Sequence, residues 1–480
     1  MQDDMEIIQS TRGGQKLCFQ GYMYTKQYCR KESIRWVCVK RNDGCKGSLM
    51  TKVDMKDPRE SKDHDHPRDR VEIEVTKARQ QMKERAEQTR EMPMQIHSEI
   101  ISSINDPDVQ SQLPQASTCK KVLQRVRNKK YPKDPSSHED LEFVGPWALT
   151  KEDGERFLLH DNKSTTDRIV IFSTDTGLRK LSESKIWFMD GNFQMAPALF
   201  EQLYVIHVPL GESSIAVVYA FLQRKTEGTY CSLLDTLCEE AEAKGHFPFP
   251  DTVVIDFELA VHNAIQSMFD GAQINGCYYH LSQCVWRKIQ NLGLSTLYRD
   301  DENFRLFCGK LNALAFLPIA EVEEGYNHLR EIAPVEATEL VDYFGSTFVY
   351  SYKKIRAAGG LCRFKRCAPQ YAPGTWNVNS TTLNDGDRTN NLSEAWNNKF
   401  RILVGTKHPS IWRAVECLQQ ENSATEVLLS QTDAGNPPKK RIKRKYVQLQ
   451  ERLKNLCEQH RDGQSNVNDF LRRVGRHLRS

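Results

Sequence analysis

The stretch IWFMDGNFQMAP (residues 186–197) begins as an apolar β-strand and then places Asp190 directly before a glycine. A second apolar run, TVVIDF (residues 252–257), reaches Asp256 in the same way. Aspartates often follow strands because turns favour them, so either residue alone more often marks a turn than a site. Two carboxylates at the ends of adjacent strands can, however, share two divalent metal ions, as phosphoryl transfer requires. Such hard oxygen ligands suit Mg²⁺ or Mn²⁺.

The segments around these two strands alternate between strand and helix patterns. Further apolar runs stand at residues 156–161, 168–174, 202–209 and 214–223, and helical patterns follow at 229–245 and 258–269. From about residue 281 to 383 the pattern is mostly helical. This order of elements predicts an α/β fold.

Composition points to more than one domain in an ordinary globular protein. The chain has 480 residues, of which 39% are hydrophobic and 27% charged, and its net charge is only +4. Bulk charge is therefore a weak argument for nucleic acid, and local clusters matter more. The N-terminus lacks a secretory pattern and the longest apolar stretch, residues 203–222, is broken by PLGESS, so we expect no membrane span. The fourteen cysteines are expected to be reduced thiols, some of them metal ligands.

Two cysteines and two histidines near the N-terminus form a candidate zinc site. Cys38 and Cys45 make a C-x6-C pair, and His64 and His66 make an H-x-H pair. Four such ligands suit tetrahedral zinc, although by spacing alone two core cysteines and a solvated loop are an equal alternative. Together with Tyr24 and Trp36, these residues make the segment of about 10–68 resemble a FLYWCH-type zinc finger. The resemblance implies a small β-rich domain that holds Zn²⁺ and binds DNA or protein.

Five motifs between residues 190 and 400 resemble the transposase domain of Mutator-like elements, the MULE family. They are DGNFQMAPALFEQLYVIH, VYAFLQRKTEGTYCSLLDTL, VVIDFELAVHNAI, GCYYHLSQCVWRKIQ and RTNNLSEAWNNKF, within a resemblance that spans about residues 110–475. The resemblance implies an RNase H-like fold, in which helices flank a mixed sheet, at about 150–405, with a DDE triad on Asp190, Asp256 and Glu394. The gap of 394 − 256 = 138 residues implies a helical insertion at about 285–385.

The third acid and a nearby cysteine–histidine pair leave alternatives open. Asp385 and Asp387 lie close to Glu394 in sequence, but NDGD reads as a turn, whereas Glu394 sits in a helical run. Cys277 and His280 form a C-x2-H element that belongs to the same family pattern. It could be half of a zinc site, a shaping element beside the catalytic metals, or a core thiol with a hydrogen-bonded histidine. Further ligands for such a site could come from Cys284, Cys362 and Cys367.

Residues 69–135 read as a charged helical connector, followed by a helix-turn-helix-like pair of helices. The second helix carries cations over most of its surface, which favours contact with DNA over a solvated face. The residues predicted to bind DNA are Lys120, Lys121, Arg125, Arg127, Lys129 and Lys130. The remaining helical region, 406–480, contains PPKKRIKRKY (437–446), a basic run that fits a nuclear import signal and predicts a nuclear protein.

Two functional hypotheses follow. The first is a MULE-type DNA transposase that cleaves DNA at element ends, transfers the strands to target DNA and, by analogy, works as a homo-oligomer. The second is a domesticated, catalytically silent regulator that keeps the fold and binds DNA. A decayed copy whose triad is intact by chance is a third possibility.

Overall fold

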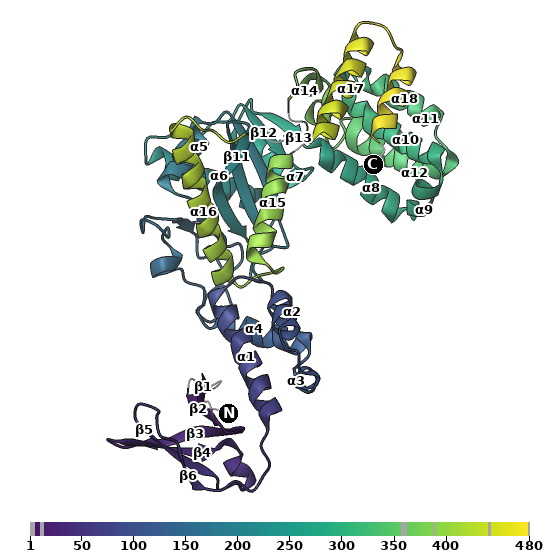
Figure 1. Cartoon of the computed structure of the whole chain (residues 1–480). Coiled ribbons are helices and arrows are strands. Elements are labelled where there is room, and N and C mark those ends of the chain that lie inside the picture. Colours follow the sequence, from purple (N-terminus) through teal and green to yellow (C-terminus); the bar gives the residue numbers. More distant parts are fainter. Residues whose placement is uncertain are drawn as a thin grey trace. The chain divides into compact units, whose positions relative to one another are not determined.

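The computed structural model describes residues 5–9, 14–356, 362–386, 388, 390–439 and 443–478. It divides into two compact units, Met1–Lys133 and Asp134–Ser480 (Figure 1). Within the described residues, no helix combines the length and the apolar character that crossing a bilayer requires.

The first unit begins with a six-stranded antiparallel sheet, in which each strand pairs with the next along the chain. Its core is formed by fully buried Leu17, Tyr24, Trp36 and Leu49. This confirms the predicted small β-rich domain. The strands are β1 (Glu6–Gln9), β2 (Gln15–Phe19), β3 (Tyr22–Cys29), β4 (Ser33–Cys38), β5 (Ser48–Lys52) and β6 (Arg59–Lys62), with the 3-10 turn η1 (Val39–Asp43) after β4.

Four helices complete the first unit: α1 (Arg70–Gln88), α2 (Pro93–Ser102), α3 (Pro107–Gln112) and α4 (Ala116–Asn128). Helix α1 packs on its neighbours instead of acting as a free connector. Its first turns bury Ile73 against the sheet, and Ala78, Met82 and Ala86 then pack against α2 and α4. This buried face could not be recognised in the sequence, because small alanines between many charged residues give a weak apolar pattern. The expected turn at NDPD forms the start of the short helix α3.

The second unit contains a seven-stranded mixed sheet. Its strands are β7 (Leu158–Asp161), β8 (Ile169–Phe172), β9 (Ile186–Asn192), β10 (Gln202–Leu210), β11 (Ser213–Leu222), β12 (Thr252–Ile255) and β13 (Gln273–Gly276). In the sheet they stand in the order β13-β12-β9-β10-β11-β8-β7. Strands β9, β12 and β13 run parallel to one another, and the other pairs are antiparallel. The predicted α/β fold with a mixed sheet is therefore confirmed.

Helices cover both faces of this sheet (Figure 1). Helices α5 (Asp175–Glu183), α6 (Glu227–Glu242) and α7 (Leu259–Met268) share a core with Trp187 and Met189 of β9. Because side chains alternate along a strand, Phe188 and Asp190 point to the opposite face. There α15 (Asn391–Val404) contacts β9 and β11, and α16 (Ile411–Asp433) packs beside α15 on β11.

The segment between β13 and α15 forms a second, mainly helical core. Its helices are α8 (Tyr278–Asn291), α9 (Ser295–Asp300), α10 (Glu302–Ala313), α11 (Val322–Glu331), α12 (Thr338–Phe344), α13 (Pro373–Trp376) and α14 (Asn379–Leu383). Short turns of helix in this segment are η3 (Leu314–Phe316), η4 (Ile319–Glu321), η5 (Val335–Ala337) and η6 (Gly345–Val349), and one more, η2 (Gly145–Trp147), stands before β7. The helical pattern did not reveal one feature, a separate two-stranded hairpin of β14 (Ser351–Arg356) and β15 (Cys362–Cys367).

The C-terminal helices join this second core. Leu453 and Cys457 of α17 (Arg444–Arg461) and Phe470 of α18 (Val467–His477) are buried among the side chains of α8 to α12. The predicted C-terminal region 406–480 is therefore divided between two parts of the second unit: α16 packs on the sheet, whereas α17 and α18 pack in the helical insertion. The basic run 437–446 lies between them, and Lys440, Arg441 and Ile442 of that run are outside the described residues.

Candidate active site and zinc site

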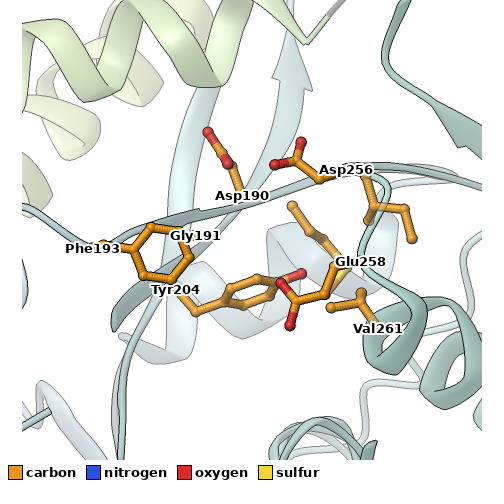
Figure 2. A pocket seen from close by; sticks show the side chains of 9 residues that line it. Asp190, Gly191, Phe193, Tyr204, Asp256, Glu258 and Val261 are labelled. Atoms are coloured by element: carbon orange, nitrogen blue, oxygen red, sulfur yellow. The ribbon is translucent and has the colours of Figure 1, made fainter. Parts of the chain in front are cut away.

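The strand register places the two aspartates of the sequence motifs side by side. Strands β9 and β12 are parallel neighbours, and Val254 stands opposite Phe188. Two residues further along, Asp190 lies inside β9, which continues to Asn192 and does not end at the aspartate as the sequence pattern predicted, and Asp256 directly follows the last residue of β12. Both side chains therefore stand at neighbouring positions on the same face of the sheet. Figure 2 shows both side chains together on one side of a pocket. The pocket is lined by Met189, Asp190, Gly191, Phe193, Tyr204, Ile255, Asp256, Glu258 and Val261.

Asp190 is the more deeply buried of the two carboxylates. Only 8% of the residue is exposed, whereas the side chain of Asp256 is 39% exposed. Burial and, second, the negative charge of Asp256 raise the pKa of Asp190 to about 7. A buried carboxylate with a second carboxylate beside it is an arrangement that a bound cation relieves.

Helix α15 contributes two polar side chains, Asn397 and Glu394, to the surroundings of these two aspartates. Asn397 donates a hydrogen bond to Asp190 at 2.6 Å and accepts one from Asn192 at 2.9 Å. Glu394 stands one turn earlier on the same side of the helix. Its Oε1 is buried and accepts no hydrogen bond from the described residues. Burial raises the pKa of Glu394, while the charges of His280 and Asp256 act on it in opposite directions.

Asn397 and the pocket residue Glu258 are two site residues that sequence reasoning missed. The spacing of Asn397, three residues after Glu394 on one helix, could have pointed to it. Glu258 follows Asp256 by two residues and accepts a hydrogen bond from the Tyr230 hydroxyl at 2.8 Å. Burial raises the pKa of Glu258. In Figure 2 its carboxylate lies apart from Asp190 and Asp256, beside Tyr204.

The structure places His280 on Asp256, with Nδ1 of the imidazole 2.5 Å from Oδ1 of the carboxylate. Burial lowers the pKa of His280, but the Asp256 carboxylate and, after it, the Cys277 sulfur more than offset this and raise the pKa to about 11. Cys277 is fully buried, and its sulfur accepts a hydrogen bond from the backbone N–H of Asn390 at 3.1 Å. This contact ties the end of β13 to the segment that leads into α15.

These contacts favour the shaping alternative for Cys277 and His280. Among the described residues, the finger supplies the only group of three or more Cys, His, Asp or Glu ligands whose ligand atoms all lie within 4.8 Å of one another. Cys277, His280, Cys284 and Cys367 form no such group, and the side chain of Cys362 is outside the described residues.

The alternative third acids are placed differently from Glu394. Asp385 is exposed and pairs with Lys454 of α17, and it accepts a hydrogen bond from Gln450 at 3.1 Å. These contacts bind the Asp385 carboxylate to α17, which packs in the helical insertion. Asp387 is outside the described residues. The role of Glu394 stays a prediction, and its burial near Asp256 and His280 supports it over Asp385.

The four predicted zinc ligands converge in the first unit. Cys38 Sγ lies 3.2 Å from His66 Nε2, Cys45 Sγ lies 3.5 Å from His64 Nδ1, and the two histidine nitrogens are 3.3 Å apart. Zinc bonds of about 2.0–2.3 Å in a tetrahedron separate neighbouring ligand atoms by roughly 3.3–3.8 Å. The cluster therefore has the dimensions and the donor types of a structural zinc site.

The surroundings of the cluster orient each ligand. The other ring nitrogen of His64 lies 2.9 Å from the Tyr24 hydroxyl, and that of His66 lies 2.9 Å from the carbonyl of Pro67. Backbone N–H groups donate to both sulfurs at 3.3 Å. A Cβ atom at Gly47 would lie 2.5 Å from the His64 ring, so a glycine is needed there. The carbonyl of Pro67 can only accept, so it selects the His66 tautomer whose Nε2 is free for metal, and the Tyr24 hydroxyl can accept from His64 in the tautomer whose Nδ1 is free.

Five of the six residues predicted to contact DNA are exposed on α4 or just after it, at positions 120, 121, 125, 129 and 130. Arg127 is the exception. Its guanidinium donates hydrogen bonds of 2.7–3.0 Å to the carbonyls of Ala86, Thr89 and Glu91, at and beyond the C-terminus of α1. A cation there satisfies carbonyls that the helix leaves unpaired, so Arg127 holds the helices together.

Comparison with known families gives two matches. Residues 7–66 match the FLYWCH zinc finger domain, and residues 186–284 match the MULE transposase domain. No curated protein matches the chain. The second match includes Asp190, Asp256, Cys277 and His280 but ends before Glu394. The chain therefore carries a zinc finger with its complete ligand cluster and a transposase-type domain, in agreement with the sequence-based predictions.

Proposed function

We propose that this chain is a MULE-type transposase that cuts DNA at the ends of a mobile element and joins the cut strands to target DNA. The observation that carries the proposal is the parallel register of β9 and β12, which sets Asp190 and Asp256 side by side on one face of the sheet. The match to the MULE transposase domain supports a function of the transposase type.

The site suits Mg²⁺ or Mn²⁺. Asp190, Asp256 and Glu394 offer hard oxygen donors, and the buried Oε1 of Glu394 accepts no hydrogen bond from the described residues. We infer that these three residues hold the catalytic ions. When bound, two such ions activate the attacking oxygen and stabilise the leaving oxygen.

The reaction needs no protein nucleophile. Water adds to the scissile phosphorus as the bond to the 3′ oxygen breaks, and a 3′-hydroxyl and a 5′-phosphate result. The 3′-hydroxyl then attacks a target phosphodiester, forms a new ester bond and releases the target's 3′ oxygen as a hydroxyl. In this scheme Asn397 holds the orientation of Asp190, and the cationic imidazole of His280 offsets negative charge beside Asp256.

DNA binding is assigned to the finger and to the exposed cations on and just after α4. The resemblance of both domains to DNA-handling families supports this, and the basic run 437–446 supports entry into the nucleus. Joining two element ends calls for at least two active sites, so we propose a homo-oligomer.

The test uses the chain's own genomic flanks as substrate. Purified protein is incubated with a plasmid that carries both flanks, with Mg²⁺ or Mn²⁺, and new 3′ ends are mapped. Cuts at the flank ends are expected for the wild type and for Asp385→Asn, which removes the alternative carboxylate. They should be lost in Asp256→Asn and Glu394→Gln. Equal cutting by Asp256→Asn would refute the proposed site.

A domesticated regulator is the second candidate, and two observations favour it. The four finger ligands converge within 4.8 Å of one another, and exposed cations stand on and just after α4. A chain kept for DNA binding would need these two features only. Tight and selective DNA binding without any cut in the plasmid assay would establish this alternative.

A further inference from the structure

The hairpin of β14 and β15 is not among the DNA-binding elements proposed above, and its sequence is rich in positive charge. Residues 351–367 contain six lysines and arginines and no aspartate or glutamate. The two strands pair only with each other. Both strands also expose aromatic rings, since Tyr352 is 55% and Phe364 71% exposed.

The register of the hairpin sets like charges opposite one another. Lys353 lies directly across from Lys365, and both side chains are exposed. Like charges at directly opposed positions destabilise a strand pair, and an isolated hairpin is marginal in water even without them. Among the described residues, no acidic side chain pairs with Lys353, Lys354 or Lys365. The cross-strand pairs of the hairpin therefore contribute little to its stability.

The opposite face combines aromatic rings with cations. Tyr352 pairs across the ribbon with Arg366, and Lys354 pairs with Phe364, so these four side chains share one face. Arg366 also anchors the base of the hairpin, because it pairs with Glu323 of α11 at 2.6 Å and lies over the Tyr350 ring. The ribbon thus carries lysines on both faces and exposed rings on one of them.

The base of the hairpin is linked by packed rings to the strand end that carries Asp256. Phe348, just before β14, packs against Tyr371 with ring centres 5.9 Å apart. The Tyr371 hydroxyl donates a hydrogen bond to the carbonyl of Phe257 at 2.7 Å. The base of the hairpin is therefore connected by packed side chains to the strand end beside the candidate active site.

We propose that this hairpin is a further DNA-binding element, which lies in the groove of duplex DNA held at the active site. A two-stranded ribbon fits the major groove, whose walls present phosphates to both faces of the ribbon. Cations on both faces are complementary to those walls, and the two rings contact sugars or base edges. This inference rests on the proposed function, since it assumes that the substrate is DNA.

The test measures binding and needs no cleavage. The full-length double variant Lys353→Gln, Lys365→Gln is titrated with a random-sequence DNA duplex at several salt concentrations, without Mg²⁺ or Mn²⁺. Each lost phosphate contact lowers the slope of log affinity against log salt by about 0.9, so the double variant should lose about 1.8. This corresponds to an affinity loss of up to about 60-fold near 0.1 M salt.

The matched control is Lys185→Gln, Lys244→Gln, which removes the same charge from lysines that pair with Asp251 and Asp175. Its slope should stay at the wild-type value. A third variant, Tyr352→Ser, Phe364→Ser, should weaken binding and leave the slope unchanged. Equal slopes for the hairpin and control variants would overturn the inference. A parallel titration with single-stranded RNA completes the test, and a loss of affinity seen only with this RNA would also overturn the inference. A protein that never cuts DNA but passes this test would refute the proposed enzyme and keep the hairpin's role.

Discussion

Gly276→Ala should damage the candidate active site without touching any of its carboxylates. Gly276 ends β13, and a Cβ atom there would lie 2.6 Å from the ring of Phe257, the residue after Asp256. Ordinary contact begins near 3.4 Å, so ring or strand must move by about 0.8 Å. The ring cannot swing aside, because Phe348 and Tyr371 pack against it with ring centres 5.4 and 5.1 Å away.

Two consequences should follow together. Overpacking of this kind costs roughly 1–3 kcal/mol of the free energy of unfolding. A displacement approaching 1 Å at Asp256 should lower the rate of DNA cleavage by roughly 10- to 100-fold. The first quantity is measured by urea unfolding followed by tryptophan fluorescence, and the second by the plasmid cleavage assay at saturating Mn²⁺.

Gly374→Ala is the control, because nothing lies within 4 Å of a Cβ atom placed there and its backbone is helical. It should be neutral or stabilise by a few tenths of a kcal/mol. The reasoning is refuted if Gly276→Ala unfolds and cleaves like the wild type. It is also refuted if stability falls but cleavage does not, since Asp256 would then be independent of this packing.

Three further predictions concern other parts of the chain. Burial lowers the pKa of His207 to about 3, so its neutral form stabilises the fold above pH 6.5, and this stability is lost as the pH falls toward 3. Going from pH 7 to 5 should cost about 2 kcal/mol more in urea unfolding for the wild type than for His207→Asn. Arg127→Gln should destabilise the first unit by roughly 1–3 kcal/mol, whereas Lys121→Gln should weaken DNA binding and leave the melting temperature unchanged. The purified chain should contain one zinc ion by elemental analysis, and Cys45→Ala should contain none and lose the folded signal of the first unit. Zinc retained by that variant would contradict the ligand set.

Local patterns in the sequence predicted the α/β fold and singled out the finger ligands and the two aspartates as candidates, and the resemblance to two families then favoured their roles as ligands and catalytic residues. Each rests on residues close together in the chain: an apolar run that ends in Asp190 or Asp256, or a pair of ligands a few residues apart. Hydrophobic period and ligand spacing are local properties, so a single sequence reveals them.

The tertiary structure decided everything that joins distant segments. It brought Asn397 to Asp190 across 207 positions, placed α17 and α18 in the insertion, and turned Arg127 from the expected DNA surface toward the end of α1. It also formed a charged hairpin inside a stretch that reads as helical. These contacts depend on which faces pack together, and that choice is made by the summed burial of many side chains, which no local period records.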